Sequence, residues 1–141
     1  MIRFELVTLN GTKFGEEVYE VILPTPQGYI GVLPHHAPLV SIASPGVITI
    51  RRKESDRDEH MEVFATNGGV IEVSGDTVRM LVDEADHSTE INEAEAQKAY
   101  EQAQRLRGEA KSQIELNQAQ SMIDRQAVRL QVASLKRRHH R

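Results

Sequence analysis

The sequence predicts an antiparallel β-sandwich or flattened barrel of about 85 residues, followed by a pair of helices. Three observations carry this prediction. Between residues 2 and 82, short apolar runs with mostly two-residue alternation are separated by turn signals rich in Gly, Pro and Asn. Beyond Asp86 the chain contains no proline, and apolar residues recur every three or four positions. The first pattern is typical of half-buried strands, and the second is typical of amphipathic helices.

About eight short strands are expected in the first part of the chain. We place them at residues 4–9, 18–23, 29–33, 39–42, 47–50, 61–64, 70–73 and 78–82. The segments between them hold turn residues, such as Asn10-Gly11, Asn67-Gly68-Gly69 and Ser74-Gly75-Asp76. Asn and Gly accept the positive φ angles that tight hairpins require. Frequent turns between short strands favour antiparallel pairing over βαβ units.

Two helices are expected in the second part. Their apolar seams consist of Ala96, Ala99, Ala103, Leu106 and Ala110, and of Leu116, Ala119, Ile123, Ala127, Leu130 and Ala133. Gly108 is expected to end or loosen the first helix, and the short break predicts an antiparallel hairpin. We therefore divide the chain into a sandwich domain, residues 1–86, and a helical hairpin with a basic tail, residues 87–141.

The seams are mostly alanine. An alanine buries about a third of the apolar area of a leucine, so at about 25 cal/mol per Å² the helices are held together weakly. Alanine also has the highest helix propensity, so each helix persists when it is not packed. We therefore expect an arm that can change its docking. The alternative is that small residues simply allow two helices to pack closely.

Composition and charge exclude several classes of function. The chain has no cysteine, which excludes disulfides, thiolate metal sites and thiol nucleophiles. No apolar run approaches the ~20 residues that cross a bilayer, and the N-terminus has no signal-peptide pattern. Residues 136–141 contain 4 of the 17 basic residues, so the first 135 residues carry 13 basic against 21 acidic groups. An acidic body with a basic tip argues against nucleic-acid binding and suits an acidic protein surface.

The sequence offers little catalytic chemistry. No nucleophile stands beside a base, and no Gly-rich phosphate loop is present, so a hydrolase is a distant alternative. The acidic stretch Asp83–Asp86, with His87, is interpreted as a solvated linker and not as a metal site. Arg125 and Arg129 lie four residues apart on one helix face, where they are either surface charge or a means of binding an anion.

Four stretches then form a pattern along nearly the whole chain. They are PQGYIGVLPHHAPLV at residues 26–40, SPGVITI at 44–50, NGGVIEV at 67–73 and RLQV at 129–132. In this order they resemble the epsilon subunit of F-type ATP synthases. The resemblance implies a ten-stranded β-sandwich with a C-terminal helical hairpin, in a non-catalytic subunit of the rotor.

The resemblance also implies partners. The sandwich would bind the gamma subunit and the ring of c subunits, and Gly31, Pro34, His36 and Pro38 are the candidate residues of this rotor face. The arm would extend into the catalytic alpha and beta subunits and inhibit ATP hydrolysis. The protein would lie at the cytoplasmic face of the bacterial plasma membrane and meet the membrane only through the complex. One departure is His35, which stands where the family often has glycine.

A second departure concerns nucleotide binding. Some bacterial epsilon subunits bind ATP through a motif that opens the first helix and matches residues 91–96 here. Ile91 and Ala96 fit the motif, but Asn92 lacks the carboxylate and Glu95 replaces a cation. The arginines of the second helix in that site resemble Arg125 and Arg129. Since a like charge near a polyphosphate costs a few kcal/mol, we expect weak or absent ATP binding and no cofactor.

The basic tail is the last candidate. In the extended state it would approach an acidic loop of the catalytic beta subunits, so inhibition would be strengthened in a salt-sensitive way. The residues concerned are Lys136, Arg137, Arg138 and Arg141. The alternative is a solubilising tail. For the whole chain, the main alternatives are a stand-alone sandwich adaptor that dimerises through its helical arm, and a sensor that binds ATP.

Overall fold

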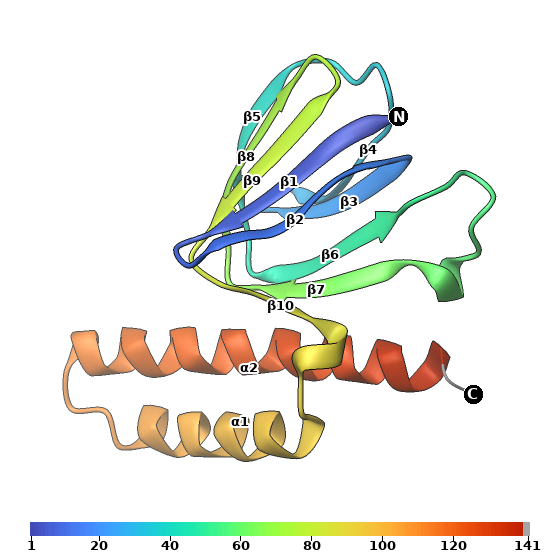
Figure 1. The fold of residues 1–141 in the computed structure, drawn as a ribbon. Coiled ribbons are helices and arrows are strands. Elements are labelled where there is room, and N and C mark those ends of the chain that lie inside the picture. The colour runs from blue at the N-terminus through green and yellow to red at the C-terminus, as the bar shows by residue number, and fades with distance from the viewer. Residues whose placement is uncertain (140–141) are drawn as a thin grey trace.

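The computed structural model describes residues 1–139, and it contains two five-stranded sheets packed face to face above a pair of helices (Figure 1). The first sheet has the strand order β2 (Gly11–Val18), β1 (Ile2–Thr8), β9 (Thr77–Val82), β8 (Gly69–Ser74) and β5 (Leu39–Ala43). The second has the order β10 (Ala85–His87), β7 (Glu62–Thr66), β6 (Gly46–Arg51), β3 (Glu20–Thr25) and β4 (Gly28–Val32). The predicted sandwich is therefore confirmed, with the ten strands that the resemblance implied.

Two of these strands were not recognised from the residue pattern. In β2 only Phe14 and Val18 are buried, so the strand shows no apolar alternation. Strand β10 has three residues and lies within the acidic stretch. One pairing is also unexpected, because β1 and β9 run parallel, from Arg3 opposite Thr77 to Val7 opposite Leu81. All other pairings in the two sheets of the described chain are antiparallel.

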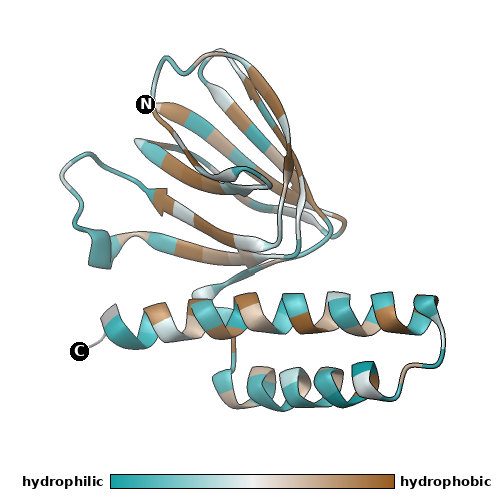
Figure 2. Ribbon diagram, turned by 180° about the vertical axis from the view of Figure 1, so that it is seen from behind, coloured by the Kyte–Doolittle hydropathy of each residue, from teal (hydrophilic) through white to brown (hydrophobic). Residues whose placement is uncertain are grey.

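The core lies between the sheets and comes from alternate residues of the strands (Figure 2). Phe4, Leu6, Ile48, Ile71 and Met80 are among the largest side chains that are fully buried there. Burial of each side chain of this size contributes about 1.5–3 kcal/mol. These contacts explain how a small sandwich supports a separate helical appendage.

The Asn67-Gly68-Gly69 turn is not a hairpin. It carries the chain from β7 in one sheet to β8 in the other, whereas the expected hairpin turns at Asn10-Gly11 and Ser74-Gly75-Asp76 join neighbouring strands. Gly68 has a φ of 107°. A Cβ atom at Gly69 would lie 2.0 Å from the carbonyl oxygen of Leu81. The glycines are needed for the crossover and for the close approach of two backbones.

The helices form an antiparallel pair below the second sheet. Helix α1 spans Glu93–Gly108 and α2 spans Gln113–His139, while short 3₁₀ turns occupy Asp58–His60 (η1) and Ser88–Glu90 (η2). The Asn92 side chain caps α1 by accepting a hydrogen bond of 3.0 Å from the backbone N–H of Glu95. Asn92 therefore has a structural role of its own at the position where the nucleotide motif has a carboxylate.

Helix α2 lies between the sandwich and α1, and it packs on both. Ala96, Ala103 and Ala119 are buried, as expected for the seam between the helices. Leu106 and Ala127, also assigned to the seams, are exposed. At 3.6 residues per turn, the three positions from Ala103 to Leu106 leave the two side chains about 60° apart around α1, so they do not face the same neighbour. Val128 and Val132 form a second buried stripe on α2, which packs against the sandwich. The expectation of one apolar seam for this helix did not include it.

Candidate functional site

The four candidate rotor-face residues lie at one edge of the sandwich. Gly31 is in the edge strand β4, and the other three are in the loop that crosses to β5, the edge strand of the other sheet. Gly31 and Pro38 are exposed, while Pro34 and His36 are half-buried. The backbone N–H of His36 donates to the carbonyl of Leu33 at 3.2 Å. Gly31 thus lies near the end of β4, just before the loop that holds the other three residues.

His35 adopts the backbone conformation that glycine favours. Its φ is 69°, in the left-handed region, and it is the one non-glycine residue with positive φ in the described chain. Its side chain is exposed. A side chain in this conformation costs about 1 kcal/mol. His35 therefore occupies a backbone conformation that suits glycine better than a residue with a side chain.

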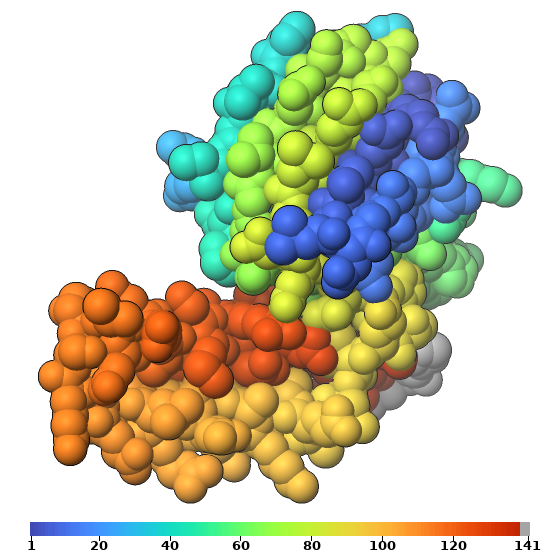
Figure 3. Space-filling view, turned by 60° about the vertical axis from the view of Figure 1, so that its left-hand side comes forward, coloured from blue at the N-terminus to red at the C-terminus, as the bar shows by residue number. Residues whose placement is uncertain are grey.

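An apolar row on the outer face of the first sheet was missed by the sequence analysis. Ile42, Val70 and Leu81 are directly opposite one another across β5, β8 and β9, and they are 66%, 45% and 48% exposed. Val7 continues the row on β1. Figure 3 shows this face of the sheet above the projecting helices. Adjoining exposed apolar side chains on one face of a sheet are typical of a protein interface.

The sequence contained a signal for this row. Strand β5 has apolar residues on both faces, since Val40 and Ile42 are exposed while Ala43 is buried. A strand with one solvated face would carry polar residues at these positions. The Leu33–Pro38 loop joins β5 at Leu39, and the row crosses the same strand at Ile42, toward its other end. Val40, which is 73% exposed, lies between them.

The arginines of α2 are paired with the acidic stretch. Arg125 Nη2 lies 2.8 Å from Glu84 Oε2, and Arg129 Nη1 is hydrogen-bonded to Asp86 Oδ2. The interpretation of residues 83–86 as a solvated linker is therefore wrong for Glu84 and Asp86. Sequence analysis could not find these pairs, because their members are 41 and 43 residues apart in the chain.

The remaining residues of the nucleotide motif are used in packing. Ile91 is buried in a cluster with Val47, Val63, Val128 and Val132, and Ala96 is buried in the seam. Glu95 is exposed. Of the positions that resemble a nucleotide site, Ile91, Arg125 and Arg129 thus join the arm to the sandwich in this chain.

The basic tail is described only in part. Lys136 is half-buried and Arg138 is exposed. The guanidinium of Arg137 lies 3.4 Å from a carboxylate oxygen of Glu93, at the start of α1. Arg141 lies outside the described residues.

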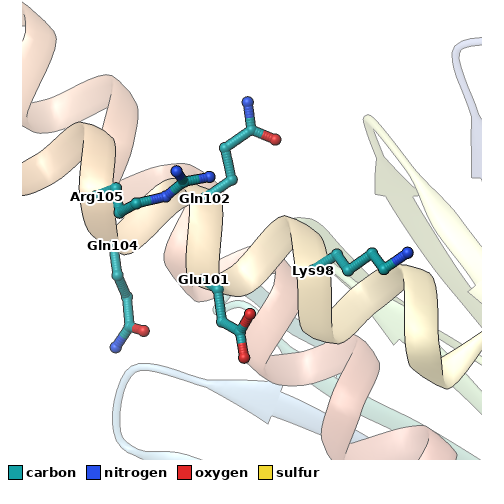
Figure 4. A pocket seen from close by; sticks show the side chains of 5 residues that line it. All are labelled: Lys98, Glu101, Gln102, Gln104 and Arg105. Atoms are coloured by element: carbon teal, nitrogen blue, oxygen red, sulfur yellow. The ribbon is translucent and has the colours of Figure 1, made fainter.

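The four hollows described here, all formed by residues 1–139, are open to solvent. Three of them surround Arg125 at the junction of sandwich and arm. Another lies along α1 and is lined by Lys98, Glu101, Gln102, Gln104 and Arg105 (Figure 4). These five side chains come from a single helix, so no second element closes around a ligand there. In residues 1–139, neither helix combines the length and the apolar character needed to cross a bilayer.

Known proteins match both parts of this architecture. The profile of the family described as "ATP synthase, Delta/Epsilon chain, beta-sandwich domain" matches residues 1–88. The ATP synthase epsilon chain of Moorella thermoacetica is 35% identical over 132 residues, which cover 94% of this chain and 96% of the relative. The chain belongs to the ATP synthase delta/epsilon chain family. The resemblance in the sequence is thereby confirmed.

Further members of the family extend the comparison. The chloroplastic epsilon chain of Adiantum capillus-veneris is 34% identical over 126 residues, covering 89% of this chain and 92% of the relative. The fold is shared with a chain of the Euglena gracilis mitochondrial ATP synthase, with a TM-score of 0.79 at 21% identity over 94% of this chain and 81% of that one. A chain of the Tetrahymena thermophila central stalk and c-ring gives 0.60 at 13% identity over 92% and 96%.

Proposed function

We propose that the protein is a non-catalytic subunit of the central stalk of a proton-translocating ATP synthase. The match over nearly its full length to ATP synthase epsilon chains carries this proposal. Its sandwich would couple the rotor to the catalytic head. The complex would be associated with the cytoplasmic face of the bacterial plasma membrane, and this chain would meet the membrane only through the complex.

The rotor partners would be the gamma subunit and the ring of c subunits. The supporting feature is the surface formed by the Leu33–Pro38 loop together with the apolar row Ile42, Val70, Leu81 and Val7. Burial of exposed apolar area contributes about 25 cal/mol per Å², which favours a stable protein partner at this face. Within this surface, Gly31, Pro34, His36 and Pro38 form the edge of the interface.

The arm, residues 87–141, would be the regulatory part. When released from the sandwich it would reach the catalytic alpha and beta subunits and inhibit ATP hydrolysis. Lys136, Arg137, Arg138 and Arg141 would then meet acidic groups of that head. ATP would bind weakly or not at all, because Arg125 and Arg129 already pair with carboxylates and Glu95 adds negative charge.

A double variant tests the rotor-binding role. Replacing Ile42 and Val70 by Asp places two charges in the apolar row, and we expect gamma-subunit binding to weaken at least about 100-fold, or about 2.8 kcal/mol. The measurement is titration of the purified gamma subunit with the full chain. Ile114→Asp, the same kind of change at an exposed site on α2, is the matched control. Unchanged affinity of the double variant would rule out this face.

The alternative of a stand-alone adaptor that dimerises through its alanine seams finds no support. Ala96, Ala103 and Ala119 are buried within a single chain, so the seams are already occupied. A monomer in sedimentation equilibrium at micromolar concentration is the expected result.

A further inference from the structure

The arm is attached to the sandwich over a short stretch of α2. Val128, Val132 and Ala133 pack in one apolar cluster with Val47, Val63 and Ala65 of β6 and β7. Helix α1 packs along the far side of α2 (Figures 1 and 2). The first part of α2 and the hairpin turn project beyond the sandwich (Figure 3). The arm is thus held to the sandwich by the second half of α2 and by Ile91, which is buried in the same cluster.

The ion pairs lie within this same stretch. Arg125 and Arg129 are one helical turn apart, which places their Cα atoms about 6 Å apart along the axis. Glu84 directly precedes β10 and Asp86 lies two positions later within it, and two residues of a strand span about 6.6 Å. The spacing of the two cations therefore matches the spacing of the two anions. Each arginine reaches its own carboxylate without distorting the helix.

The two pairs differ in their exposure to solvent. The side chains of Arg129 and Asp86 are 17% and 27% exposed, while those of Arg125 and Glu84 are 43% and 45% exposed. A pair shielded from water is screened less by salt than an exposed pair. Arg129 Nε is also buried without a hydrogen-bond partner in the described chain. Loss of Asp86 would therefore leave a largely buried guanidinium without its counter-charge.

We propose that Glu84 and Asp86 act as built-in counter-anions that latch α2 to the sandwich through Arg125 and Arg129, so that this chain holds its arm closed without a nucleotide. The inference rests on the proposed function of the arm and adds its control. Asp86 is the main contact of the latch, and Glu84 is the weaker one. A free polyanion competes with these carboxylates for the arginines, so it loosens the arm and does not fasten it.

Spin-label distances test the latch directly. The chain has no cysteine, so Glu72→Cys on β8 and Gln118→Cys on α2, both exposed positions, give one labelled pair in the full chain. We expect a single narrow distance distribution for the parent protein. Asp86→Asn and Arg129→Gln should each raise the population of longer distances about ten-fold, and Glu84→Gln about two-fold. An unchanged distribution in both Asp86→Asn and Arg129→Gln would overturn the proposal.

A charge exchange separates the latch from general damage to the fold. Asp86→Arg alone should release the arm, and Asp86→Arg combined with Arg129→Asp should restore the narrow distribution. Failure of the double variant to restore it, with the sandwich intact by circular dichroism, contradicts a latch made by this pair. Arg79→Gln is the matched control, because it removes an arginine paired with Glu5 on the sandwich and should leave the distances unchanged.

A polyanion decides the direction of the effect. At low ionic strength, millimolar tripolyphosphate should increase the released population in the parent protein and have little further effect in Asp86→Asn. If it narrows the distribution instead, the arginines form an anion-binding site and the proposal fails.

The latch and the proposed regulatory function fail separately. ATP hydrolysis of the assembled enzyme reports the function, whereas the distances in the free chain report the latch. If the latch variants released the arm but ATP hydrolysis were unchanged, the proposed latch would stand and regulation by the arm would be contradicted. If the distances were unchanged but inhibition of ATP hydrolysis were altered, the proposed latch would be contradicted and regulation by the arm would stand.

Discussion

At the scale of single residues, two side chains carry information that the family pattern alone would not supply. His35 keeps the left-handed backbone of the loop although glycine is the residue suited to it. Asn92 lacks the carboxylate of the nucleotide motif, yet it caps α1. Each residue thus has a defined local role in this chain, His35 in a left-handed turn and Asn92 at the start of α1.

Because the His35 side chain is exposed, the effect of replacing it on the free energy of unfolding should depend on how readily the new residue adopts a positive φ. His35→Val places a β-branched residue at a φ of 69° and should lower the free energy of unfolding by about 1–2 kcal/mol. His35→Gly should not lower it, because glycine adopts this conformation without strain. Urea denaturation of the three proteins gives the comparison. Equal stability of the Val and Gly variants would show that the loop is not strained.

At the scale of elements, the segment between the sandwich and α1 is tied down at its root. The 3₁₀ turn η2 is fixed by Glu90, whose carboxylate accepts hydrogen bonds from Lys13 Nζ at 2.8 Å and from the His87 backbone N–H at 3.0 Å. The hydrogen bond from Lys13 and the bond from the His87 backbone hold the pKa of Glu90 below its usual value. The contact between Glu90 and Lys13 thus fixes the start of the arm against β2.

The lowered pKa of Glu90 makes this contact sensitive to acid. Because the pKa is lower in the folded chain, the contribution to stability is complete above the unfolded value of ~4.3 and is lost as the pH falls through the lowered value. The pair is partly exposed, so the contribution is about 0.5 kcal/mol. Hydrogen exchange of the η2 amides, followed from pH 6 to pH 3, should show this loss in the parent protein.

Glu90→Gln is the control for this pH dependence. Its exchange should be faster at pH 6 and should lack the acid-dependent step. An identical pH profile in both proteins would assign the step to another carboxylate.

At the scale of the whole molecule, most of the fold could be predicted because the two periodicities differ so clearly. The apolar alternation of β3, β6, β8 and β9 and the three-to-four spacing of the helices are local properties of the chain. Strand β2 escaped because polar residues such as Lys13 and Glu17 fill it. The pairing of Arg129 with Asp86 and the alignment of Ile42 with Val70 depend on tertiary register, which no local pattern contains.

The basic tail belongs to this scale, because its proposed partner lies outside the chain. Truncation after Leu135 removes residues 136–141 and, within the described part of the tail, one exposed ion pair, Arg137 with Glu93. The free energy of unfolding should therefore change by less than about 0.5 kcal/mol. Inhibition of ATP hydrolysis in the assembled enzyme should weaken several-fold at low salt, and the difference should vanish near 0.5 M salt. Full inhibition by the truncated chain at low salt would identify the tail as a solubilising segment.

The projecting part of the arm also has a mechanical consequence. Helix α2 has 27 residues and is about 40 Å long, and its first residue, Gln113, lies about 18 Å along the axis from Arg125. A force applied at the projecting end of α2 therefore exerts a torque about the edge of the sandwich, and this torque acts on the contacts that attach the helix. A small force from a rotating neighbouring subunit would release α2 more easily when it is applied at the projecting end than when it is applied near Arg125.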